Sequence, residues 1–127
     1  MLEAVVILVE DEELLQVSID RSLKDGGFDV LTVASADEAM ALLKSGVVKY
    51  SALVIDIYLK DGGSGWDVAR LAREIDPSVA VVYATSASAD DWRAQGVSNS
   101  VFLQKPFTLA QLVKSVAQLL PSKDTSK

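Results

Sequence analysis

The sequence predicts an α/β domain in which helices cover both faces of a central parallel β-sheet. Three observations lead to this prediction. Short apolar runs rich in β-branched residues alternate with stretches that have the spacing of amphipathic helices. The first of these runs, Val5–Val9, is apolar at every position, as a strand buried on both faces is. The chain has 127 residues, half of them hydrophobic, which suffices for one domain with one core.

Five apolar runs are the expected strands. The first is Val5–Val9, in which every residue is aliphatic and four of the five are β-branched. The other four are residues 28–33, 52–56, 79–84 and 101–103.

Stretches with helical spacing separate these strands. Leu15, Ile19 and Leu23 recur every four residues, and the glycine pair at 26–27 ends this helix. Apolar residues keep helical spacing from 68 to 75, and a proline follows two positions later.

Two further helices begin at predicted capping boxes, Ser35 with Glu38 and Thr108 with Gln111. Residues 88–95 have only a weak helical pattern, so we expect the fourth helix to be short.

Five alternating units of this kind predict a doubly wound, flavodoxin-like sheet with strand order 2-1-3-4-5 and right-handed crossovers. In such sheets ligands bind at the carboxyl ends of the strands, where the winding reverses between strands 1 and 3. We expect one domain over residues 1–121, followed by a polar tail at 122–127.

Composition excludes several classes of protein. The net charge is −6, so the chain would repel a nucleic-acid backbone and no direct nucleic-acid partner is expected. There is no Cys and no His, which removes disulfides, thiol chemistry and the commonest zinc ligand. No apolar run is long enough to span a membrane, and no basic region precedes the first apolar run as in a signal peptide. These features predict a cytoplasmic protein with no membrane partner.

Polar side chains stand at the carboxyl ends of four expected strands. Glu10 and Asp11 follow the first strand, Asp56 ends the third, Thr85 follows the fourth and Lys105 follows the fifth. Two carboxylates ~4 Å apart repel by about 4 kcal/mol at an effective dielectric constant near 20, so this cluster needs positive partners. A small set of carboxylate oxygens that also meets phosphate favours Mg²⁺.

Charge counting supports a phosphoryl-transfer site. Three carboxylates are balanced by one Mg²⁺ and by Lys105, which would flank a phosphoryl group arriving at Asp56. Each residue also has an ordinary explanation: the acid pair could start a helix, Asp56 could be a turn residue and Thr85 a plain strand residue. These ordinary explanations do not account for the position of all these polar residues at one edge of the sheet. The functional interpretation is therefore preferred.

The chain resembles the receiver domain of bacterial response regulators from Val5 to about Leu120. The resemblance implies a phosphoacceptor switch of a two-component system, which assists only its own phosphorylation and dephosphorylation and is not an enzyme in the ordinary sense. The matching motifs are Val9-Glu10-Asp11-Glu12, Val54-Ile55-Asp56, Gly65-Trp66-Asp67, Thr85 and Lys105-Pro106-Phe107.

The resemblance also implies roles for single residues. Asp56 would become an acyl phosphate. Asp11, Asp56 and the backbone carbonyl of Tyr58 would ligate Mg²⁺, with Glu10 acting directly or through water. Tyr58, two residues after Asp56, would tune hydrolysis, and we expect it to shield the acyl phosphate.

Further implied roles concern the far side of the site. Thr85 would bind the phosphoryl oxygens, Lys105 would pair with them, and the Lys105–Pro106 bond would be cis. Phe102 would be an aromatic switch, or else ordinary core packing. Output would run through the face made by helix 4, strand 5 and helix 5 to an unknown output protein.

With no His in the chain, the phosphoryl donor must be another molecule, a histidine kinase or a phosphotransfer protein. The chain could be a standalone receiver or one excised from a hybrid kinase.

The sequence departs from the family pattern in two loops. The loop after Asp56 is one residue longer than usual, with Lys60 where a proline is common. The stretch from Thr85 to Lys105 is shorter than usual, and Ser86 replaces the usual Ala or Gly. We therefore expect residues 86–100 to be loosely ordered without phosphate. Trp92 would either anchor a partner or pack against the last helix.

Two alternatives belong to other functional classes. A flavodoxin-type electron carrier needs a non-acidic, hydroxyl-rich loop after strand 1, where this chain has four consecutive acids at 10–13. A colourless purified protein would exclude it. A phosphatase that uses an aspartyl phosphate carries an Asp-x-Asp pair on strand 1, which is missing here. Turnover of a phosphate ester would revive that alternative.

Overall fold

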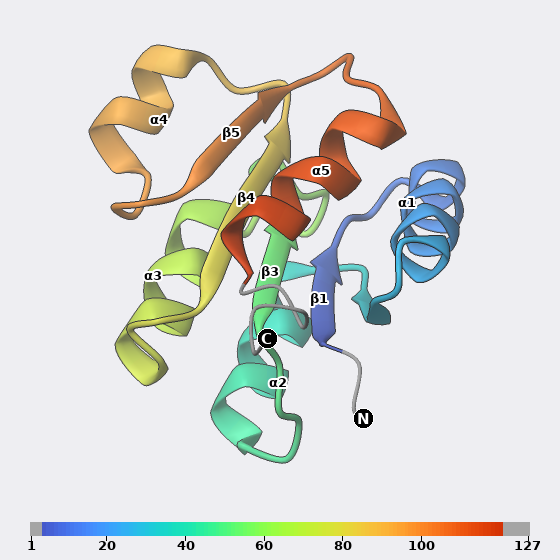
Figure 1. Cartoon of the computed structure of the whole chain (residues 1–127). Helices are drawn as coiled ribbons and strands as arrows, with labels where there is room; N and C mark the ends of the chain where they lie inside the picture. Colours follow the sequence, from blue (N-terminus) through green and yellow to red (C-terminus); the bar gives the residue numbers. More distant parts are fainter. Residues whose placement is uncertain (1–3, 121–127) are drawn as a thin grey trace.

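The computed structural model describes residues 4–120 as a five-stranded parallel sheet with helices between the strands (Figure 1). The strand order is β2-β1-β3-β4-β5, as the alternation of elements predicted. The strands are β1 (Val5–Val9), β2 (Asp29–Val33), β3 (Ala52–Ile55), β4 (Ala80–Thr85) and β5 (Val101–Gln104). The helices are α1 (Glu13–Asp25), α2 (Ala36–Ser45), α3 (Gly65–Ile75), α4 (Ala89–Gln95) and α5 (Leu109–Leu119).

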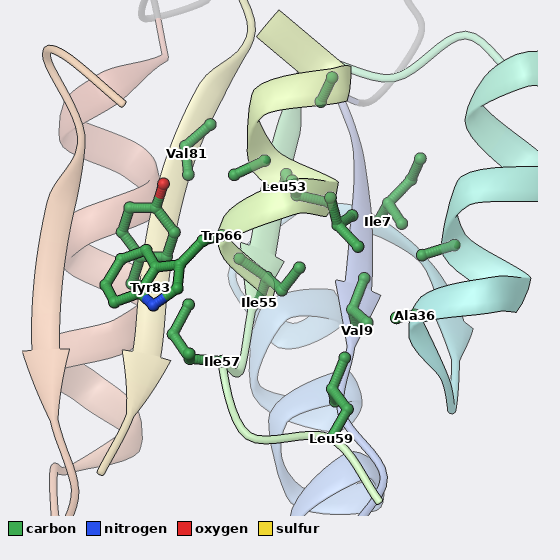
Figure 2. Packing of buried hydrophobic residues seen from close by; sticks show 14 of the residues in the cluster. Ile7, Val9, Ala36, Leu53, Ile55, Ile57, Leu59, Trp66, Val81 and Tyr83 are labelled. Carbon is green, nitrogen blue, oxygen red and sulfur yellow. The ribbon is translucent and has the colours of Figure 1, made fainter. Parts of the chain in front are cut away.

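The two faces of the sheet bury two separate apolar clusters, because successive side chains of a strand point to opposite faces. On one face Val6 and Leu8 pack with residues of α1 and α5. On the other face Ile7 and Val9 pack with residues of α2 and α3 (Figure 2). Both clusters contain fully buried strand residues, so the continuous apolar runs correctly predicted a sheet covered on both sides.

Helix starts follow the predicted capping residues, with one difference. At α5 the Thr108–Gln111 capping box is complete. At α2 only half of the predicted box forms: Ser35 accepts a hydrogen bond from the N–H of Glu38, but the Glu38 carboxylate accepts from the N–H of Ala34. The chain enters α2 in an extended conformation at Ser35, which brings the preceding amide within reach of Glu38.

The fourth helix is short, as expected. It has seven residues, and each of them is at least partly exposed. Its attachment to the domain therefore depends on a few specific contacts rather than on an apolar face.

No helix within residues 4–120 is long and apolar enough to cross a membrane. The Lys105–Pro106 bond is cis, in agreement with the resemblance. Two predictions concern residues outside the described part of the chain. They are the polar tail at 122–127 and the absence of a signal peptide, which depends on the residues before Ala4.

Candidate functional site

The register of the central strands brings the acidic residues of β1 and β3 side by side. Val9 of β1 is paired with Ile55 of β3, and both strands end there. The backbone N–H of Asp56 donates to the carbonyl of Val9 at 3.0 Å, so the parallel pairing continues for one more residue. Glu10 and Asp56 therefore leave the sheet at the same level, as the strand-end argument predicted.

Glu10, Asp11 and Asp56 each offer a carboxylate oxygen, and these oxygens lie within 4.8 Å of one another. Glu10 is 1% exposed and Asp56 is 6% exposed, whereas Asp11 is half-buried at the rim. Three carboxylate oxygens this close form a donor set that suits a hard divalent cation such as Mg²⁺. The residues present fit the metal that the charge count predicted.

Lys105 supplies the positive charge inside this cluster. Its Nζ lies 2.9 Å from Oδ2 of Asp56 and 3.4 Å from Oε1 of Glu10. Burial by itself would lower the pKa of Lys105, but the hydrogen bond and charge of Asp56, followed by those of Glu10, raise the pKa above its usual value. The ammonium form is therefore held at neutral pH between two carboxylates.

Burial has the opposite consequence for Glu10. Its desolvation is the largest influence and raises the pKa of the carboxyl group, and the charge of Asp56 raises it further. The N–H of Glu12, 3.1 Å from Oε2, and the ammonium of Lys105 offset only part of this effect. In its charged form Glu10 therefore lowers the stability of the folded domain, and a further cation beside it would offset this cost.

Thr85 ends β4 beside the residue that follows Asp56. Its Oγ1 is fully buried and accepts hydrogen bonds from the N–H groups of Ala87 at 3.2 Å and Ile57 at 3.4 Å. Its carbonyl accepts the backbone N–H of Lys105 at 2.7 Å. One residue therefore links β3, β4 and the start of the Lys105 turn.

Gly65 lets helix α3 start directly against Asp56. A Cβ atom at Gly65 would lie 2.3 Å from the carbonyl oxygen of Asp56, so no other residue fits without a shift. The next residue, Trp66, is buried and its ring packs on that of Tyr83 with centroids 5.0 Å apart. Trp66 is the second residue of α3.

Tyr58 and Phe102 lie at two different borders of the site. The N–H of Tyr58 donates to Oδ1 of Asp56 at 3.3 Å, while its side chain is 58% exposed. Phe102 is half-buried on β5, where it packs against the cluster that α3 covers. Phe102 is therefore part of the apolar packing and not of the carboxylate cluster.

Two contacts at the site were not predicted. The backbone N–H of Lys60 donates to Oδ2 of Asp11, and the side-chain amide of Gln16 donates to the carbonyl of Glu10. A backbone N–H is present in nearly every residue, so no sequence signal could have identified Lys60. Gln16 lies one turn into α1 from Glu12, a spacing that points back to the strand end and could have been noticed.

The family model for the response regulator receiver domain matches residues 6–117. The chain belongs to this family. Receiver domains are signalling domains rather than classical enzymes, they bind Mg²⁺ at an acidic pocket, and they are phosphorylated by histidine kinases or phosphotransfer proteins. In this domain Glu10, Asp11 and Asp56 form a cluster of carboxylates that could hold a metal ion.

Similar proteins include both regulators and a kinase. The chain is 34% identical over 119 residues to the transcriptional regulatory protein PrrA of Mycobacterium leprae, covering 91% of this chain and 49% of PrrA. It is 29% identical over 124 residues to the sensor kinase CckA of Brucella abortus, covering 95% of this chain and 13% of that kinase. The receiver domain thus spans about half the length, or less, of these relatives.

Solved structures agree on the fold. A response regulator receiver protein from Sinorhizobium medicae matches with a TM-score of 0.88 and 41% identity, over 92% of this chain and 94% of that one. A CheY-like receiver domain protein from Methanospirillum hungatei matches with a TM-score of 0.80 and 20% identity, over 92% and 93% of the two chains. The second likeness concerns the fold alone.

Proposed function

We propose that this receiver domain accepts a phosphoryl group on Asp56 from a phosphohistidine of a partner protein, with Mg²⁺ assisting the transfer. The 2.9 Å ion pair between Lys105 and Asp56 inside the carboxylate cluster carries the proposal. It supports Asp56 as the nucleophile, because the same ammonium group can follow the negative charge as it passes to the phosphoryl oxygens.

In the transfer, a carboxylate oxygen of Asp56 bonds to phosphorus while the phosphorus–nitrogen bond of the phosphohistidine breaks. The electron pair of that bond leaves with the imidazole ring, which then takes a proton from water. The product is an acyl phosphate. Lys105 neutralises one of the phosphoryl oxygens. The hydroxyl of Thr85 accepts hydrogen bonds from the N–H groups of Ile57 and Ala87, so its own proton is available to donate to another phosphoryl oxygen.

Four groups would hold the metal: the carboxylates of Asp11 and Asp56, the backbone carbonyl of Tyr58, and Glu10 directly or through water. When bound, Mg²⁺ supplies positive charge to the transferred oxygens and so favours attack by the anionic Asp56. Hydrolysis of the acyl phosphate at the same site returns the domain to its resting state, so the domain assists both its own phosphorylation and its own dephosphorylation.

The donor would dock beside α1, at the rim of the site. Leu14 is 80% exposed and Val17 is 59% exposed on this helix. Large exposed apolar side chains on neighbouring positions favour a protein partner. The residues that follow them in the sequence, Leu15 and Ser18, line a hollow of about 470 Å³ together with Lys105, Pro106, Phe107 and Leu109. Because Lys105 lines this hollow and also contacts Asp56, a helix seated there could bring its phosphohistidine to Asp56.

We also propose that the domain extends over residues 1–121 with a polar tail at 122–127, and that output runs through the face of α4, β5 and α5. Thr85 and Phe102 would connect this face to Asp56.

Labelling by acetyl phosphate and Mg²⁺ tests the chemistry without any partner. Intact-mass spectrometry should detect one added phosphoryl group that is stable to acid and labile to base. Asp56→Asn should abolish it. Asp29→Asn, which changes an exposed carboxylate at the start of β2, should leave it unchanged. Labelling that survives Asp56→Asn would place the nucleophile elsewhere.

Transfer from a histidine kinase that phosphorylates the wild type tests the docking face. Leu14→Asp should slow this transfer while leaving labelling by acetyl phosphate intact. Val47→Asp is the matched control, since Val47 is 78% exposed but lies before β3, at the other end of the sheet. Equal rates for all three proteins would move the donor to another face.

A further inference from the structure

The loop between β3 and α3, residues 57–64, follows Asp56 and is held at its middle by the start of α2. Oδ2 of Asp61 accepts a hydrogen bond from the N–H of Asp37 at 3.2 Å, across 24 positions of sequence. Asp37 is the second residue of α2, so its N–H has no partner within the helix. The positive end of the helix dipole also favours a carboxylate there. Asp61 thus acts as a second cap of α2, supplied by another part of the chain.

The backbone of the same loop packs directly against α2. A Cβ atom at Gly63 would lie 2.2 Å from Cβ of Ala36, the first residue of the helix. The N–H of Gly63 also donates to Oδ1 of Asp61 at 3.2 Å. Leu59, 6% exposed, points into the core cluster beside Val9 (Figure 2). The loop is therefore anchored by a polar contact on α2 and by an apolar contact in the core.

Next to these two anchors the loop touches the candidate metal ligands. The N–H of Tyr58 donates to Asp56, and the N–H of Lys60 donates to Asp11. Lys60 immediately precedes Asp61, so the position of its N–H follows from where Asp61 is held. The longer loop, which has Lys60 in place of the usual proline, thereby obtains a defined path from side-chain contacts rather than from a restricted backbone.

We infer that Asp61 is a positioning residue for phosphorylation: by binding the start of α2, it keeps the backbone of Tyr58 and Lys60 against Asp56 and Asp11. This inference rests on the proposed function of Asp56. Its consequence is that loss of the Asp61 carboxylate releases the loop and lets water reach the acyl phosphate more often. The hydrogen bond from the N–H of Asp37 is the main cause that lowers the pKa of the Asp61 carboxyl group below its usual value. The Asp61 side chain therefore stays charged at neutral pH.

The chain offers a matched pair of variants. Asp61→Ala and Ser35→Ala each remove one acceptor from the start of α2, because Oγ of Ser35 accepts the N–H of Glu38 at 3.0 Å. Both variants weaken the helix, but only the first releases the loop. The first measurement uses NMR to follow amide hydrogen exchange at Tyr58 and Lys60 in the metal-free protein. The second is the rate of phosphoryl loss after labelling with acetyl phosphate.

Asp61→Ala should speed both processes by about fivefold, which corresponds to the loss of one ordinary helix cap. Ser35→Ala should change each by less than about twofold, since its cap does not touch the loop. Equal effects of the two variants would reduce Asp61 to a helix cap and overturn the inference. An exchange effect without a change in phosphoryl loss would overturn it as well. If the wild type takes up no phosphoryl group, the proposed function fails visibly, and amide exchange still decides whether Asp61 holds the loop.

Discussion

The indole ring of Trp92 stacks on the ring of Phe102, with ring centroids 5.4 Å apart and an angle of 13° between the planes. Nε1 of Trp92 also donates to Oγ of Ser100 at 2.9 Å. Trp92 therefore packs on β5, and the expected alternative of packing against the last helix is wrong. The reason is strand geometry: Phe102 faces the α3 side of the sheet, whereas its neighbours Val101 and Leu103 face the α5 side.

Polar contacts hold the end of α4 on the rest of the domain. The hydroxyl of Tyr83 accepts the N–H of Val97 at 3.0 Å. Arg70 donates to the carbonyl of Gln95 at 3.1 Å. Arg73, on the next turn of α3, donates to the carbonyls of the segment that follows α4. The segment 86–100 is thus held at its carboxyl end by these contacts and at its amino end by the bonds of Ala87 to Thr85 and Gln104. The exposed first turn of α4 lies between these two ends.

We predict that phosphorylation changes the order of residues 86–100. Without phosphate, amides in the first turn of α4 should exchange faster than those near Val97, which Tyr83 holds. A phosphoryl mimic such as beryllofluoride should change protection in that first turn, and the Asp56→Asn variant should show no change. High and identical protection in both states would mean that the partner recognises another face.

Removal of the Trp92 ring should weaken α4 specifically. We expect Trp92→Ala to lower the free energy of local opening of α4 by about 1 kcal/mol, the usual strength of an aromatic pair. Trp92→Phe keeps a ring on Phe102 and loses only the bond to Ser100, so its effect should be smaller. Site-resolved hydrogen exchange measures both. If the two variants behave alike, the stack does not hold the helix.

Mg²⁺ affinity should depend on Asp11 more than on its neighbours. Isothermal titration calorimetry should show binding weakened by at least about tenfold in Asp11→Ala, because a direct ligand is lost. Glu10→Ala should have the smaller effect if Glu10 acts through water. Glu12→Ala is the control, an exposed acid outside the cluster. Fluorescence of Trp66, which follows Gly65 beside Asp56, gives an independent signal. Unchanged affinity in Asp11→Ala would exclude this metal site.

The lifetime of the acyl phosphate should depend on Tyr58. Tyr58→Asn should speed loss of the phosphoryl group by about tenfold if the ring shields Asp56 from water. Tyr58→Phe keeps the ring and should retain the wild-type half-life. Half-lives are measured by the decay of labelled protein after removal of acetyl phosphate. A half-life that Tyr58→Asn does not alter would show that something else shields the group.

The stability of the metal-free protein should depend on the charge of Glu10. Because burial raises the pKa of Glu10 in the folded state, the folded protein binds a proton more tightly than the unfolded one. The stability that this proton contributes is present below the unfolded-state pKa and is lost as pH rises through the folded-state pKa. With EDTA at pH 7, Glu10→Gln should therefore raise the free energy of unfolding by about 1 kcal/mol, since Lys105 keeps Asp56 as its partner.

Urea unfolding of the wild type, Glu10→Gln and the exposed control Glu12→Gln measures this difference. The advantage of Glu10→Gln should shrink as pH falls into the titration range of Glu10, because the wild-type carboxyl is then neutral as well. Saturating Mg²⁺ should remove the stability advantage of Glu10→Gln, because the metal stabilises the wild type. A variant that is less stable than the wild type at pH 7 would mean that the bonds to Lys105 and Glu12 outweigh burial.

The sequence alone determined the fold class and which polar side chains gather at one edge of the sheet. Buried parallel strands must be apolar on both faces, so runs such as Val5–Val9 were recognisable without any contact information. Parallel strands also bring their carboxyl ends to one edge, so Glu10, Asp56 and Lys105 could be placed together from their positions after strands 1, 3 and 5.

The tertiary structure decided the contacts between loops. The path of residues 57–64 over α2, the bond from the N–H of Lys60 to Asp11, and the stack of Trp92 on Phe102 had no pattern in the sequence. Periodicity reports which side of an element is buried, but a loop has no period, and its backbone donors are the same in nearly every residue. Which acceptor they meet depends on how the packed helices place the loop, and only the folded chain contains that information.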